Sequence, residues 1–371
     1  MNPSRLLLRL DAAIAAARDP LSADCLRVEL ACYLVRRGSF DDVTVTLKEL
    51  RKQYQTTPNV AMSAWLSLAE GLLIHFSNMG HSARDKILRA HALSVAAGLT
   101  QLSAICAAWL ANMDYLVADM AGMTRHVSQA LSLATQENHA ALARANLVVA
   151  HAYHLSGRLD LARPWYARAH GHATSEGDDV TISALMHNMA WLRSANLRQE
   201  TLCGMAATPS GEHALASAES THQFDTLFGS TSLHTLVPVL RAQILVVKGK
   251  FAEGLAILDE YLVPSIDQGM SRMHANLLAD QAWCRVNLGQ LRGAQIDAEA
   301  AAKLVDPNGH HDDQGSAHSR LSQTYAALGN LDLSNHHAEL AAEAWAGHEK
   351  LQRETINLLS GLPAGGVAVR R

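Results

Sequence analysis

The fold is decided by the stretch AYHLSGRLDLARPWYARA, residues 152–169. Apolar residues fall at three- and four-residue spacing on both sides of Gly157, and this spacing is typical of amphipathic helices. Glycine adopts a positive backbone dihedral at little cost, so it is favoured where a helix ends. The stretch therefore predicts two antiparallel helices joined by a tight turn at Gly157.

The same turn recurs along the chain at intervals of 40, 40, 39, 38, 54, 40 and 40 residues. The turn positions are Gly38, Asn78, Ala118, Gly157, Ala195, Gly249, Gly289 and Gly329. Seven residues before each turn the side chain is very small in every repeat except one, where Asn188 stands, and small residues allow two helices to cross closely. A fixed period in this range indicates a stacked repeat array. We therefore predict an all-α protein, a right-handed α-solenoid of about eight helix-turn-helix repeats.

The spacing also predicts how the array is divided. We expect front repeats over 1–200 with a leading helix over 4–18 that covers the first repeat, and back repeats over 233–360 that end in a long helix over about 331–360. The 54-residue interval leaves an irregular insertion over 201–232, with a loop at 208–211 and a helix from Glu212 to about Phe228. This insertion is either a passive loop or a bend or lid at the mouth of a groove. We expect 361–371 to be a flexible tail.

The pattern resembles the tetratricopeptide repeat (TPR) superfamily. The clearest unit is 142–174, and 275–307 and 315–345 also match. The unit over 142–174 carries the family's spacing through Ala150, Tyr153, Gly157, Ala162, Tyr166 and Ala169. Because the period is longer than the standard repeat, the chain is more similar to the sensor arrays of bacterial regulators, such as the maltose regulator and the peptide-sensing Rap-type proteins. The resemblance implies a binding module with a concave groove, although no effector domain of such regulators is recognisable.

Composition narrows the class of partner. The formal net charge is −4, and the sequence contains no long run of like charges. Direct binding to nucleic acid is therefore not expected, because it depends on clustered lysine and arginine residues. No uninterrupted apolar segment is long enough to span a bilayer, so no membrane is expected. The five cysteines form no C-x-x-C pair, which favours reduced thiols in a cytoplasmic protein. Arg5, Arg9 and Asp11 interrupt the first apolar stretch, which is therefore interpreted as an amphipathic helix and not as a signal peptide.

A search for chemistry is negative. The sequence lacks H-E-x-x-H, G-x-S-x-G, a glycine-rich phosphate loop and zinc-type cysteine pairs. We predict no catalytic residue, no metal and no cofactor, and therefore not an enzyme. The run His310-His311-Asp312-Asp313 is interpreted as a solvated loop, and His336 and His337 point to different faces of a helix.

Polar and aromatic residues recur on the first helix of successive repeats, the helix that lines the concave face in such arrays. They stand three, six or thirteen residues before the turn of their repeat, except Arg193, which lies close to the same face. The candidates for a ligand groove are Trp65, His75, Asn112, Tyr115, Arg144, His151, His154, Arg193, Gln243 and Trp283. Asn276 occupies an equivalent position. Aromatic rings would supply contact area, and amides would bind an extended backbone.

Two interpretations of these residues stay open. They form either a recognition strip or ordinary half-exposed groove residues. The basic clamp that some family members use for a terminal carboxylate is not visible, so acidic C-terminal tails are not expected as ligands. Histidines that titrate near pH 6 would make binding pH-sensitive.

The leading functional hypothesis is a non-enzymatic module that binds a protein or peptide partner in its concave groove. The alternative is the ligand- or peptide-sensing half of a bacterial signalling or transcription regulator that lacks its output domain, with the long final helix as the coupling element. A further hypothesis is a homodimer formed through a terminal repeat face.

Overall fold

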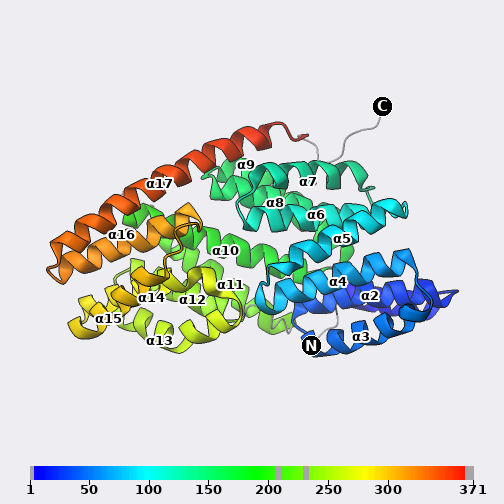
Figure 1. Cartoon of the computed structure of the whole chain (residues 1–371), viewed down its shortest axis with the longest axis horizontal. Helices are drawn as coiled ribbons and strands as arrows, with labels where there is room; N and C mark the ends of the chain where they lie inside the picture. The colour runs from blue at the N-terminus through cyan, green and yellow to red at the C-terminus, as the bar shows by residue number, and fades with distance from the viewer. Residues whose placement is uncertain (1–3, 205–209, 229–233, 364–371) are drawn as a thin grey trace.

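The computed structural model describes residues 4–204, 210–228 and 234–363, and within these ranges all regular structure is helical. The helices form pairs that stack into an α-solenoid (Figure 1). The front elements are α1 (Arg5–Ala16), α2 (Pro20–Arg37), α3 (Phe40–Thr56), α4 (Val60–Asn78), α5 (Ser82–Ala96), α6 (Thr100–Leu116), α7 (Met120–Leu133), α8 (His139–Leu155) and α9 (Leu159–Glu176). The remaining elements are α10 (Asp179–Leu202), α11 (Ser210–Phe228), α12 (Leu236–Val247), α13 (Phe251–Asp267), the 3-10 helix η1 (Met270–Met273), α14 (His274–Asn287), α15 (Leu291–Leu304), α16 (His311–Ala327) and α17 (Leu331–Ser360).

The turns follow the predicted spacing, with two local differences. Glycine has a positive φ at five of the predicted turns, for example 71° at Gly157. Ala118 adopts φ 58° at the third turn, and at the second turn Met79, not Asn78, takes the left-handed conformation. The predicted turn at Ala195 is wrong, because α10 continues to Leu202. No glycine or proline interrupts that stretch, so nothing local ends the helix before Gly204.

The predicted insertion contains α11, which begins at Ser210, two residues before the expected start. Of the predicted loop over 208–211, residues 208–209 lie outside the described residues. Most of the predicted tail, over 364–371, also lies outside them. The leading helix α1 packs on α2, where Leu6 and Leu10 share a cluster with Tyr33.

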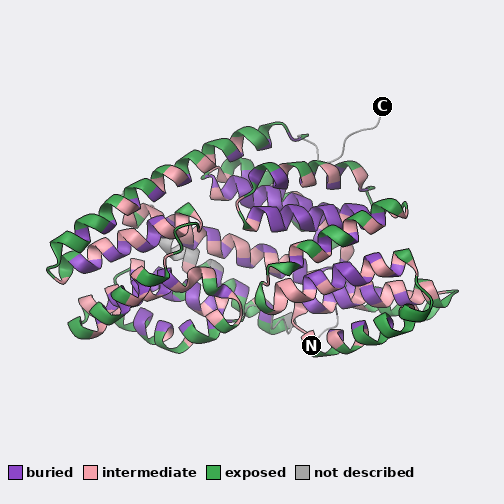
Figure 2. Ribbon diagram, in the orientation of Figure 1, coloured by how far each residue is buried: buried purple, intermediate pink, exposed green. Residues whose placement is uncertain are grey.

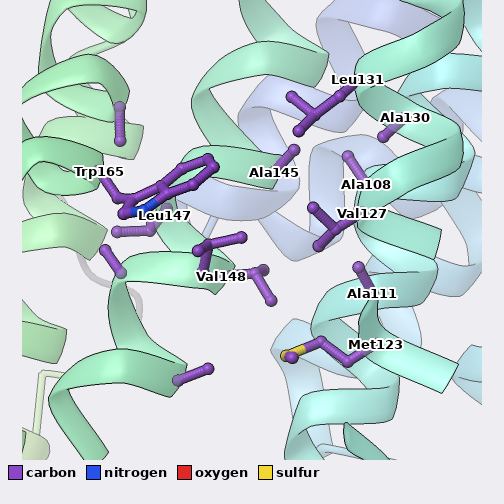
Figure 3. Packing of buried hydrophobic residues seen from close by; sticks show 14 of the residues in the cluster. Ala108, Ala111, Met123, Val127, Ala130, Leu131, Ala145, Leu147, Val148 and Trp165 are labelled. Atoms are coloured by element: carbon purple, nitrogen blue, oxygen red, sulfur yellow. The ribbon is translucent and has the colours of Figure 1, made fainter. Parts of the chain in front are cut away.

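Small residues let the helices approach one another in the core. A Cβ atom on Gly71 would lie 2.7 Å from Cγ1 of Ile87, so α4 and α5 cross where only a very small residue fits. In the next repeats Ala111 and Ala145 play a similar part beside Val127 and Leu131 (Figure 3). Figure 2 shows that burial is most complete along α6 and α8. These two first helices therefore form the centre of the front half.

Helix α4 is long and apolar enough to cross a membrane by length and composition alone. In the folded chain it lies against α2 and α5, and Leu66, Leu68 and Leu72 are buried in the front core. Its apolar character is therefore accounted for by packing between helices.

The back half, α10 to α17, closes against the turns of the front half, α1 to α9. Nε2 of His310 lies 2.9 Å from the carbonyl oxygen of Leu116. A Cβ atom on Gly269 would lie 2.8 Å from the backbone of Asn78, so only glycine permits this approach. Helix α17 then runs back across the front repeats (Figure 1). The solenoid is consequently a closed array whose inner helices face one another.

Candidate functional site

A small pocket lies where the inner helices of the two halves meet around α10. Helix α10 contacts α8, α12 and α16. Side chains from α8, α10, α12, η1, α14, α16 and α17 surround it. The lining residues are Leu155, Trp191, Ala195, Asn196, Arg198, Gln199, Gln243, Met273, Asn276, Asp312, Asp313, Ser316, Trp345 and His348. Of the ten sequence candidates, Gln243 is the one that lines this pocket.

A buried charge network lies beside the pocket and reaches its lining through Arg198. The carboxylate of Asp280 on α14 is fully buried and lies 3.0 Å from Nη2 of Arg198 on α10 and 3.0 Å from Nε of Arg320 on α16. Buried charges are tolerated when they are paired, and removal of one partner is strongly destabilising. The network therefore fixes three helices around the pocket and holds the guanidinium of Arg198 beside it.

A second charged group lies at the start of α16. Arg272 of η1 donates to Asp313, and its guanidinium also lies 3.3 Å from Asp312 and 5.6 Å from the ring centroid of Trp191. Burial raises the pKa of Asp313 to about 6, with Asp312 adding to the effect and Arg272 opposing it.

The prediction of a solvated loop through His311, Asp312 and Asp313 is therefore wrong. The helix begins at His311, and the two carboxylates in its first turn are favoured by the helix dipole as well as by Arg272. Within the described residues, no group of three or more His, Cys, Asp or Glu side chains is placed to hold a metal ion.

Several buried polar atoms around the pocket have no hydrogen-bond partner among the described residues. Among them are Oδ1 of Asn276, Nδ1 of His348 and Nε of Arg198. The amide nitrogen of Asn276 donates to Asp313 at 3.3 Å, and Nε2 of His348 lies 2.9 Å from Gln352, so both side chains are oriented. An unpartnered buried polar group costs about 1–3 kcal/mol. These atoms are suited to a ligand that brings both donors and acceptors.

Most of the other candidates gather in the front half, on α4, α6 and α8. The rings of His75 and Trp109 have centroids 6.4 Å apart, and Cζ of Arg144 lies 3.9 Å above the Trp109 ring. Two turns further along α8, the ring of His151 lies 6.0 Å from that of Tyr115. We call this set, His75, Trp109, Tyr115, Arg144 and His151, the front cluster.

His154 extends this row to the second helix of the same repeat. Its Nδ1 lies 3.0 Å from the hydroxyl oxygen of Tyr166 on α9, and the Tyr166 ring lies 5.9 Å from that of His151. These contacts form two groups on three consecutive repeats, one around Trp109 and one around His151.

No protein-family model matches the sequence, and no curated protein matches it. Among solved structures, the chain is similar to one described as "Crystal Structure of Rap Protein Complexed with Competence and Sporulation Factor". The match covers 95% of this chain and 98% of that chain, with a TM-score of 0.51 and 11% sequence identity. The fold is that of a Rap-like TPR array. The predicted resemblance is confirmed at the level of fold, and the low identity carries no further property across.

The Rap-like array buries residues that the sequence places in an open or half-exposed groove. Six of the ten candidates are less than 9% exposed: Asn112, Tyr115, Arg144, His151, His154 and Gln243. The back half approaches the end of the helix that carries Tyr115, where Nε2 of His310 lies 2.9 Å from the carbonyl oxygen of Leu116. Burial raises the pKa of Tyr115 above its usual range. An open strip is therefore the wrong description of these positions.

The four remaining candidates are half-buried and lie apart from one another. Trp65 on α4 packs on the front core, and Arg193 on α10 lies near His154. On α14, Trp283 lies beneath the guanidinium of Arg320, with Cζ 5.5 Å from its ring centroid. His75 belongs to the front cluster. The structure thus separates one predicted strip into a front cluster and a back pocket.

Burial also settles the charge of the front histidines. It lowers the pKa of His75 and of His154 to about 4, and it lowers that of His151 below its usual range, with Arg144 adding to the effect at His75 and His151. These rings are neutral from pH 5.5 to 8. The expected sensitivity near pH 6 therefore does not arise from them.

Sequence reasoning missed Trp109, Trp191, Arg198 and His348 as site residues. Trp109 stands three residues before Asn112 and therefore lies on the same helix face, so the spacing contains a usable signal. Arg198 could not be found in this way, because the misplaced turn at Ala195 put it outside the first helix of its repeat.

Proposed function

We propose that this Rap-like array is a non-enzymatic module that binds a peptide or a segment of a partner protein in its interior. The observation that carries the proposal is the set of unpartnered buried polar atoms of Asn276, His348 and Arg198 around one pocket. Trp191 and Trp345 line the same pocket and supply apolar surface. The fold supports the choice, because the resemblance to Rap-type arrays implies peptide sensing.

An extended peptide matches the chemistry of this pocket. Its backbone presents both N–H donors and carbonyl acceptors. Oδ1 of Asn276 can accept from a peptide N–H, while Nε of Arg198 and the amide of Gln243 can donate to carbonyl oxygens. Alternate peptide side chains would then pack on the indole rings.

The test is selection of peptides from a random library with the full chain, followed by measurement of Kd in solution. Asn276→Ala should weaken a selected peptide about tenfold, which is the loss of about 1.4 kcal/mol. Gln295→Ala is the matched control, since Gln295 is an exposed amide on α15 away from the pocket. Unchanged affinity in Asn276→Ala with helicity intact would contradict the proposal, as would failure of the wild-type chain to select any peptide.

A second candidate function is that of the ligand- or peptide-sensing array of a signalling or transcription regulator. The observation that favours it is the path of α17, which lines the pocket through Trp345 and His348 and then packs on the front core through Leu359. A ligand in the pocket would therefore touch the element that joins the two halves. Hydrogen exchange along the second half of α17, with and without a selected peptide, tests this function. Unchanged exchange would argue against it.

A further inference from the structure

Arg144 differs from the other buried arginines of the chain. Three arginines in the described part of the chain are less than 9% exposed: Arg144, Arg198 and Arg320. Arg198 and Arg320 share the carboxylate of Asp280. Across the described residues, Arg144 has neither an ion pair nor a hydrogen bond, and its contact is the face of the Trp109 ring.

The surroundings of Arg144 do not compensate its charge. His75 and His151, whose pKa values Arg144 helps to lower, are neutral rings. The nearby carboxylate of Asp178 is already paired with Arg36 at 2.7 Å. Burial, followed by repulsion from Arg36, lowers the pKa of Arg144 to about 9.

Contact with an indole ring offsets only part of this cost. A cation over an aromatic face gains about 2 kcal/mol or more when it is desolvated, whereas an unpaired buried ion costs several kcal/mol. A second atom points the same way: Nε2 of His151 is buried and has no hydrogen-bond partner among the described residues. His151 stands seven residues after Arg144, so the two side chains lie on the same face of α8.

We propose that the front cluster is a binding site for a carboxylate, held by the guanidinium of Arg144 and the Nε2 atom of His151. A planar guanidinium binds a carboxylate through two parallel N–H donors at its edge. Because Trp109 covers a face of the group, the edge is what remains for a ligand. Arg144 is the one positive charge of the front cluster, whose histidine rings are neutral. Its single charge is therefore better balanced by a monoanion than by a phosphate dianion.

This inference rests on the proposed function only in that the carboxylate belongs to a bound peptide. It changes one expectation from the sequence, because the front half does contain a basic residue suited to a terminal carboxylate. It also gives the interior two chemically distinct parts, a front site for an acidic group and a back pocket for backbone amides.

The test uses small probes with the full chain and records the rise in Tm and the heat of titration. The probes are N-acetyl-dialanine with a terminal carboxylate, N-acetylglutamate α-amide with a side-chain carboxylate, N-acetyl-dialanine amide with neither, and inorganic phosphate. We expect saturable binding of at least one carboxylate probe at millimolar concentration, and the better of the two identifies the source of the group. The uncharged amide should bind at least fivefold more weakly.

Variants assign the binding to Arg144. Arg144→Gln should abolish the response, whereas Arg163→Gln should keep it, since Arg163 is an exposed arginine on the second helix of the same repeat. Arg144→Lys keeps the charge without the planar fork and should bind more weakly than wild type. If Arg144→Gln does not fold, the resonance of the Arg144 Nε–H in the wild-type chain reports the contact directly.

Three results would overturn the inference: equal binding of the acid and the amide, tighter binding of phosphate than of either carboxylate, or an unchanged response in Arg144→Gln. None of them depends on peptide selection. If the probes bind and no library peptide does, the proposed function fails alone. If selected peptides bind equally well as acids and amides, whether or not they carry acidic side chains, this inference fails alone.

Discussion

In the back half Arg198 and Arg320 share one buried carboxylate, that of Asp280, whereas in the front half Arg144 lies over Trp109 with no carboxylate beside it in the described structure. Both sites are on inner helices, and both are less than 9% exposed. The back guanidinium groups have their counter-charge within the chain, so this pairing stabilises the closed array. The front guanidinium lacks one, so its charge is available to an anionic ligand. Charge compensation thus distinguishes the two guanidinium sites, although the pocket beside Arg198 can still bind uncharged groups.

The largest expected effect is a loss of stability when the buried network of Arg198, Asp280 and Arg320 is broken. Asp280→Asn leaves Arg198 and Arg320 buried beside a neutral amide, and breaking such a pair costs about 3–5 kcal/mol. Urea unfolding measures the loss. Asp259→Asn is the control, because Asp259 pairs with Arg285 while about half exposed, and an exposed pair contributes less than about 1 kcal/mol. Similar losses in the two variants would show that the buried network has no special role.

Lowering the pH should change the stability contributed by the two halves in opposite directions. Above pH 6.5, His75 and His154 are neutral in both the folded and the unfolded chain. Their pKa in the folded chain is about 4, which is lower than in the unfolded chain. As the pH falls, the unfolded chain therefore binds protons first, and the free energy of unfolding decreases. We expect a loss of about 1–2 kcal/mol for each of these two histidines between pH 7 and pH 5. Asp313 acts oppositely, since its pKa of about 6 adds stability at low pH that is lost as the pH rises through that value.

Unfolding in urea at pH 7, 6 and 5 measures this dependence. His154→Gln should flatten it, because this variant removes one of the groups that charge on unfolding. Asp313→Asn should steepen it, because it removes the opposing contribution. A wild-type chain that is equally stable at pH 5 and pH 7, with both variants unchanged in slope, would contradict the assignment.

The contact between the two halves supplies a smaller effect. The side-chain amide of Gln352 on α17 donates to the carbonyl oxygen of Leu155 at 2.7 Å. Gln352→Ala should cost about 1 kcal/mol and should speed hydrogen exchange over the second half of α17. Glu349→Ala is the control, since that side chain is exposed. Equal exchange in the two variants would show that Gln352 does not tether the helix.

The smallest effect sharpens the comparison at the front site. Arg144→Met removes the unpaired cation and keeps an apolar side chain over Trp109, so stability should be unchanged or raised. Asp280→Asn, in contrast, is expected to cost about 3–5 kcal/mol. A loss of 3 kcal/mol or more in Arg144→Met would indicate that Arg144 has a structural partner and would weaken its assignment to a ligand.

The repeat period was sufficient to predict the helical pairs, most turns and the TPR-like fold. Spacing also placed His75, Tyr115 and His151 on adjacent inner helices, where the structure finds them. It failed at Ala195, where the period predicts a turn but no residue ends the helix. It also failed at Asp312 and Asp313, which turn chemistry assigns to a loop and which Arg272 draws into the start of α16.

The sequence by itself determined that helices pair and stack, because small and apolar residues at fixed intervals act between neighbours in the chain. Only the tertiary structure decided that the two halves close on each other and bury the predicted strip. It also decided that Asp280 neutralises Arg198, 82 positions earlier, while Arg144 is left with a ring. Such pairings depend on how strongly the array curves over several repeats. This curvature is the sum of many small packing angles between helices, and no single repeat specifies it.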